Sequence, residues 1–120
     1  MATAVKTLRT LQASATNAAA ATTTSSTWTL TTALGGLLTT KITNGGTGPT
    51  VACTVTVNVS GDGSAWKSFA AATAGTTASA VFEFPVEIPP ATMYAQVVFS
   101  GNTAQGVTVE AFGQELTSIG

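Results

Sequence analysis

The sequence predicts an all-β protein, folded as a single antiparallel β-sandwich of Ig-like or jelly-roll type. Apolar residues alternate with small polar residues at a period of two, which is the spacing of a strand with one buried face. The alternating segments are short, recur roughly every ten residues, and are separated by Gly, Pro and Asn. Val, Ile and Thr fill them, and β-branched residues at this density favour strand over helix.

The first half of this pattern contains three predicted strands. Residues 27–34 alternate from Trp28 onward, with threonine on the opposite face, until Gly35-Gly36 ends the strand. A second strand follows and stops at the turn-rich residues 43–49. Residues 51–59 form the most regular strand, because every second residue is Val or Cys.

The second half begins at a hairpin signal, SGDGS at residues 60–64, since Asp-Gly supplies the positive φ values of a tight turn. Trp66 and Phe69 open a short return strand, and the small residues 70–79 are expected to form a loop. Residues 81–88 alternate again around Pro85. Proline cannot donate a ladder hydrogen bond, so this strand is predicted to lie at an edge or to contain a bulge. Two more strands are predicted at residues 94–100 and 106–116.

The first 26 residues have a different character. Val5, Leu8 and Leu11 recur at a spacing of three, which fits either a short helical turn or an extended arm packed against a neighbour. Residues 12–26 contain no large apolar side chain to offset their ordering entropy. We therefore expect an N-terminal arm over residues 1–26, with Val5, Leu8 and Leu11 binding a partner, and a sandwich domain over residues 27–120.

The composition limits the classes of partner. Charged residues are 8% of the chain, against roughly 25% in an ordinary soluble protein. The few Lys and Arg residues form no cluster, which argues against nucleic acid as a partner. We also expect no membrane span, because no apolar run approaches about 20 residues. A weakly charged surface suits broad contact with other proteins, since little charge is desolvated on docking.

Candidate chemistry is sparse, and we expect no enzyme activity, metal or cofactor. The chain has no histidine, the commonest general base and metal ligand. Glu83 and Glu87 are interpreted as solvated strand residues, because four residues of strand separate them by about 13 Å. Asp62 with Glu110 or Glu115 could bind calcium only if folding joined them.

Cys53, Trp28 and Trp66 are interpreted as core residues. Cys53 lies on the apolar face of the most regular strand, where cysteine is usually a small buried hydrophobe. Both tryptophans belong to apolar patterns, although Trp28, Trp66 or Tyr94 could also form a surface on which sugars stack.

The stretch VNVSGDGSAWKSF, residues 57–69, resembles the strand, Asp-Gly turn and Trp strand of many small sandwiches, including discoidin-like and carbohydrate-binding modules. Together with residues 31–60 and 93–116, it makes the chain similar to small virion proteins of tailed bacteriophages. This resemblance implies a sandwich fold, a virion location after assembly in the host cytoplasm, and no catalytic residues. Cement proteins of such capsids are often small sandwiches with extended arms.

Three functions follow as expectations. The first is a capsid cement or decoration protein that binds the major capsid protein through its sandwich and arm. The second is a tail or neck adaptor that binds other virion subunits. The third, of another class, is a carbohydrate-binding module. The weakly charged surface and unpaired strand edges further predict a homo-oligomer, either a dimer or a trimer.

Overall fold

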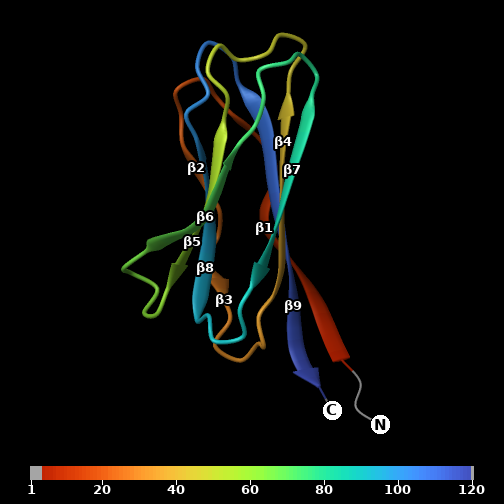
Figure 1. Cartoon of the computed structure of the whole chain (residues 1–120), viewed down its shortest axis with the longest axis vertical. Helices are drawn as coiled ribbons and strands as arrows, with labels where there is room; N and C mark the ends of the chain where they lie inside the picture. Colours follow the sequence, from red (N-terminus) through yellow and green to blue (C-terminus); the bar gives the residue numbers. More distant parts are fainter. Residues whose placement is uncertain (1–3, 120) are drawn as a thin grey trace.

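The computed structural model describes residues 4–119, which form nine strands in two antiparallel sheets (Figure 1). The first sheet has four strands, in the order β1 (Ala4–Asn17), β9 (Val107–Ile119), β4 (Gly36–Asn44) and β7 (Val81–Ile88). The second sheet is ordered β2 (Thr23–Thr24), β8 (Tyr94–Ser100), β5 (Thr54–Ser60) and β6 (Lys67–Thr73), and β3 (Trp28–Thr29) also pairs with β8. The predicted all-β antiparallel sandwich is therefore confirmed.

The connections identify the sandwich as a jelly roll. Because β2 and β3 pair with different stretches of β8, they act as two pieces of one strand. Apart from the β5–β6 hairpin, each following connection crosses from one sheet to the other. This order is the double Greek key of a jelly roll, one of the two alternatives that the sequence left open.

The predicted alternation of buried and exposed residues is observed in the central strands. In β5, Val55 and Val57 are fully buried, and the residues between them are partly exposed. The predicted strand at residues 94–100 coincides with β8. Pro85 lies on β7, an edge strand that pairs with β4, as predicted. The core lies between the sheets and includes Trp28, Leu30, Leu38, Ile42, Val55, Val57, Ile88, Val97, Phe99, Val107 and Val109.

Several predicted strand boundaries differ from the structure. The strand predicted at residues 51–59 begins only at Thr54, and two other segments differ more. Only Trp28–Thr29 of the strand predicted at residues 27–34 is a regular strand. The Leu30 amide adds one hydrogen bond to the Met93 carbonyl before the chain turns where the Ala33 amide donates to the Leu30 carbonyl. The loop predicted at residues 70–79 begins inside β6, which continues to Thr73. Small side chains suggested a loop, but the backbone of this segment hydrogen-bonds to β5.

The N-terminal segment does not form a separate arm, and no boundary falls at residue 26. Residues 4–17 form β1, which pairs with β9 along its length. Residues 20–25 continue onto the second sheet, where the Ser25 amide donates to the Val97 carbonyl. The backbone hydrogen bonds order this low-complexity stretch, which its side chains alone could not do. The β1–β9 ribbon extends past the end of the sandwich (Figure 1).

A buried polar cluster holds the β1–β2 connection against the β8–β9 turn. Asn102 is fully buried, and its Nδ2 donates to the carbonyls of Gln105 (2.9 Å) and Asn17 (3.2 Å). The Asn17 Nδ2 donates to the Asn102 Oδ1 at 2.6 Å, and the Thr23 hydroxyl donates to the Asn17 Oδ1 at 2.7 Å. This cluster joins two segments that are 85 residues apart in the sequence.

No helix that could cross a membrane occurs within residues 4–119.

Candidate interaction surfaces

The candidate calcium ligands are not brought together. Glu115 pairs with Arg9, and Glu110 pairs with Lys41. Asp62 accepts hydrogen bonds within its own turn. The amides of Ala65 and Ser64 donate to this carboxylate and hold the pKa of Asp62 below its usual range. Across the part of the chain that the structure describes, no three Asp, Glu or Cys side chains form a group that could hold a metal ion.

Of the three aromatic residues considered for sugar stacking, only Trp66 and Tyr94 are partly exposed. Trp28 is 2% exposed and packs in the core, as predicted. Trp66 and Tyr94 are half-buried, and the Tyr94 ring lies beside Gly63 in the β5–β6 turn. A stacking platform would therefore have to be built without Trp28.

Cys53 is fully buried in the core, as the sequence predicted. Burial raises the pKa of its thiol to about 11, although the Ser100 backbone acts in the opposite direction. Because the thiolate is the nucleophile, a neutral and buried thiol does not react with electrophiles.

Cys53 is therefore expected not to react with Ellman's reagent at pH 8 in the folded protein, and to react completely in denaturant. The absorbance of released thionitrobenzoate measures both states. Rapid modification of the folded protein would show that this strand opens far more often than the structure implies.

Arg9, Glu115 and Trp28 form an anchor where the ribbon leaves the sandwich. The Glu115 side chain is 6% exposed, and its Oε1 accepts from the Arg9 Nε at 2.6 Å and from the Trp28 Nε1 at 3.3 Å. A buried carboxylate is stable only when it is paired and hydrogen-bonded. The anchor thus fixes both strands of the ribbon to the core.

The outer side of the four-stranded sheet carries exposed leucines near this ribbon. Leu8 on β1 lies opposite Gln114 on β9, which lies opposite Leu37 on β4. Leu8 is 62% exposed and Leu37 is 41% exposed. We call this surface the apolar face, and it consists of Leu8, Leu34, Leu37, Pro90 and Leu116.

Two shallow grooves cross the apolar face. One has a volume of about 470 Å³ and runs between Leu8 and Leu37. The other, of about 400 Å³, lies between Leu34 and Pro90. Both are lined by Leu37 and Leu116, so the two grooves are adjacent on this face.

The three residues predicted to bind a partner have different environments. Val5 is 47% exposed and Leu8 is 62% exposed, so both are accessible on the ribbon. Leu11 is 6% exposed and belongs to the core. The structure therefore corrects the prediction for Leu11, because β1 has entered the sandwich by residue 11 and turns this side chain inward. Leu37 and Leu116, in contrast to Leu11, line the apolar face beside Leu8.

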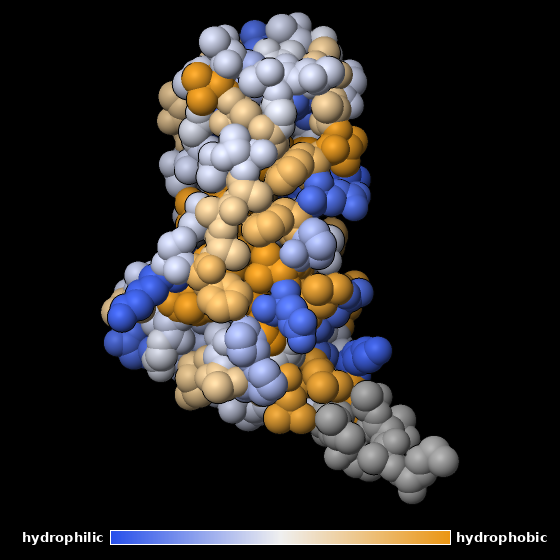
Figure 2. Space-filling model, in the orientation of Figure 1, coloured by the Kyte–Doolittle hydropathy of each residue, from blue (hydrophilic) through white to orange (hydrophobic). Residues whose placement is uncertain are grey.

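A second apolar surface lies where the sandwich is open. β6 and β7 are the edges of their sheets and face each other without pairing among the described residues. We call this gap the seam. Figure 2 shows an apolar stripe across the middle of this side of the molecule. Phe69 on β6 is 44% exposed, and the partly buried side chains on the two strands are Ala70, Ala72, Phe82 and Phe84.

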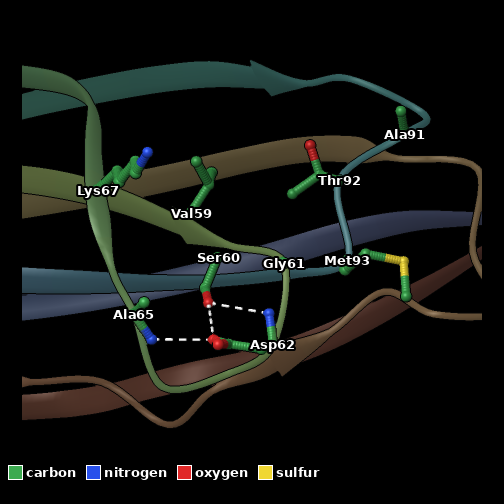
Figure 3. Close-up of a pocket in the computed structure, with 9 residues that line it drawn as sticks. All are labelled: Val59, Ser60, Gly61, Asp62, Ala65, Lys67, Ala91, Thr92 and Met93. Carbon is green, nitrogen blue, oxygen red and sulfur yellow. Dashed lines mark hydrogen bonds between the residues drawn. The ribbon is translucent and has the colours of Figure 1, made fainter.

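An apolar groove of about 630 Å³ continues the seam at one end (Figure 3). It lies between the β5–β6 turn and the β7–β8 connection, with Val59 and Met93 on its walls. Lys67 and Asp62 are its charged residues, and the Asp62 carboxylate already accepts hydrogen bonds from its own turn. The groove therefore suits an apolar segment better than a charged ligand.

No protein-family model matches the sequence, and no curated protein matches it. Solved structures do share the fold. A structure of infectious bursal disease virus, Gx strain, matches with a TM-score of 0.64 at 10% identity, over 95% of this chain and 32% of that one. The PBSX exported protein XepA matches with a TM-score of 0.62 at 14% identity, over 93% and 37%.

Two further structures match a larger share of their own chains. The SPBc2 prophage-derived protein YomS has a TM-score of 0.52 at 11% identity, over 93% of this chain and 95% of that one. The K3 adhesin domain of Lys-gingipain from Porphyromonas gingivalis has a TM-score of 0.59 at 12% identity, over 84% and 72%. Identities this low establish a shared fold and leave function to be argued from the surfaces.

Proposed function

We propose that this protein is a non-catalytic structural subunit of a phage virion, and specifically a cement or decoration protein of the capsid. The observation that carries the proposal is the presence of two separate apolar surfaces, the apolar face and the seam, on different sides of one small sandwich. A protein that joins neighbouring subunits of a shell needs at least two such surfaces. A monomeric binding module needs only one.

The low charge of the chain and its fold also support the proposal. Charged residues are only 8% of the chain, so either surface can be buried without desolvating many charges. The jelly roll is shared with a virus structure and with a prophage-derived protein. The major capsid protein is the expected partner, and the seam is its expected contact because its groove accepts an extended apolar segment.

A variant at the seam tests this contact. Phe69→Asp places a charge on an exposed position of β6, so folding is retained while docking of an apolar partner is opposed. We expect at least a tenfold loss of occupancy on purified particles, because an unpaired charge buried at an interface typically costs several kcal/mol. Thr24→Asp, on β2 at the opposite edge of the same sheet and also exposed, is the matched control and keeps occupancy.

Gel densitometry and electron microscopy of the particles measure occupancy and position together. Hundreds of copies over the shell support a cement protein, whereas about a dozen copies at one vertex indicate the neck or tail adaptor. Absence from purified particles, together with a specific signal on a glycan array, would replace the virion role with carbohydrate binding.

A further inference from the structure

The apolar face carries two opposite charges at its opposite edges. Lys6 lies on β1 and lines the groove beside Leu8. Glu87 lies on β7, directly opposite Leu37, and lines the second groove. Within the described residues, neither Lys6 nor Glu87 takes part in an ion pair. Between the two charges, the face is formed by the uncharged side chains of Leu37, Gln114 and Leu116.

Each charge therefore lies on an outer strand, and the two inner strands place only Leu37 and Gln114 between them in the row of Glu87. The charged pair of the inner strands, Lys41 and Glu110, lies further along the sheet. Neighbouring strands are about 4.8 Å apart, so β1 and β7 are separated by roughly 14 Å across the sheet. That distance is too long for Lys6 and Glu87 of one chain to pair. An arrangement with opposite charges on either side of an apolar centre is complementary to itself.

We propose that the apolar face is the interface with a second copy of this chain. The two four-stranded sheets pack face to face about a two-fold axis that runs parallel to their strands. This rotation places β1 of each copy over β7 of the other. Such an isologous contact uses one surface twice and closes as a dimer.

The rotation brings three sets of residues from the two copies together. Along the strand direction, Lys6 of each copy is offset from Glu87 of the other copy by one row, about 7 Å. A lysine side chain is long enough to span this offset. Leu8 of each copy lies over the second groove of the other, in the row of Glu87. Near the axis, Leu37 of each copy lies over Gln114 of the other. The dimer buries the most exposed leucine of the chain and leaves the seam of each copy open.

Charge reversal tests the proposal in solution, independently of any particle. We expect Lys6→Glu and Glu87→Lys each to raise the dimer dissociation constant at least tenfold, because each places like charges across the interface. The double variant is expected to restore dissociation to within about threefold of the unaltered protein. Restoration requires contact between copies, since the two positions cannot meet within one chain.

Sedimentation velocity over a concentration series measures the dissociation constants, and circular dichroism with a melting curve shows that each variant is folded. Lys67→Glu, on the other sheet, is the matched control and leaves the dimer unchanged. The proposal is overturned if the unaltered protein is monomeric at about 100 µM, a concentration at which even weak specific dimers form. It is also overturned if the single variants have no effect, or if the double variant is as weak as either single variant.

Failure of the dimer and failure of the proposed function are distinguishable. The dimer is measured on purified protein, whereas the virion role is measured by occupancy of particles through the seam. A protein that decorates particles but is monomeric at high concentration contradicts only the proposed dimer.

Discussion

Trp28→Ala is expected to lower the free energy of unfolding by about 3–5 kcal/mol, the range for truncating a large buried aromatic side chain. Trp28 is 2% exposed, and its ring lies against Gly113, so closely that a Cβ at that position would come within 2.7 Å of the ring. The substitution leaves a cavity above the glycine. It also removes the indole donor from the buried Glu115 carboxylate. For a domain of about 5–15 kcal/mol, this loss is a large fraction of the total.

Urea denaturation followed by circular dichroism measures this effect. Trp28→Phe is the matched control, because it retains a six-membered aromatic ring and removes the smaller ring together with the hydrogen bond to Glu115, for an expected cost of about 1–2 kcal/mol. If the alanine variant lost less than about 1 kcal/mol, the ring would not be the central packing element that the structure shows.

Asn102→Asp is expected to destabilise the fold by at least about 3 kcal/mol at pH 7, because it places a carboxylate in a fully buried site. The surrounding groups are the carbonyls of Asn17, Ala18 and Gln105, which now accept from the Asn102 amide and would repel an anion. The introduced carboxyl would have a pKa raised above its unfolded value of about 4. The penalty therefore grows as the pH rises above about 4, and shrinks as the pH falls towards it.

Denaturation at pH 7 and at pH 4.5, with the unaltered protein measured alongside, checks both the size and the sign of this effect. Asn58→Asp serves as the control, because Asn58 is only partly buried on β5 and its substitution should cost under about 1 kcal/mol. A destabilisation by Asn102→Asp that did not diminish towards pH 4.5 would contradict a buried, ionised carboxylate as its cause.

Local pattern predicted the strands well, because alternation in segments such as β5 and β8 reports directly which face is buried. It could not predict β1, since the hydrogen bonds that order this strand come from β9, about a hundred residues later. The same separation prevented prediction of the role of Glu115, because its partner Arg9 lies 106 positions away in the sequence. Sequence periodicity carries no information on which distant strands pair, so the strand order also had to come from the structure.

The candidate surfaces were only partly predictable. Leu8 was identified from its spacing, but the same spacing included Leu11, which the β1–β9 register turns inward. The exposure of Leu37 was predictable, because it is next to the core residue Leu38 in the strand and must therefore point outward. No local sequence pattern predicted the seam. It arises because β6 and β7 end different sheets, which is a property of the topology.

The position of β9 also constrains when the chain can fold during synthesis. Of the described strands, β9 is synthesised last, yet it lies between β1 and β4 and joins them into one sheet. Until it emerges, β1 has no neighbour and β4 pairs on only one side. Contacts between segments about a hundred residues apart are slow to form, because a long loop must close before they are gained. The four-stranded sheet is consequently completed only after β9 has been synthesised, so until then partly synthesised chains expose β1 and β4 to pairing with other chains.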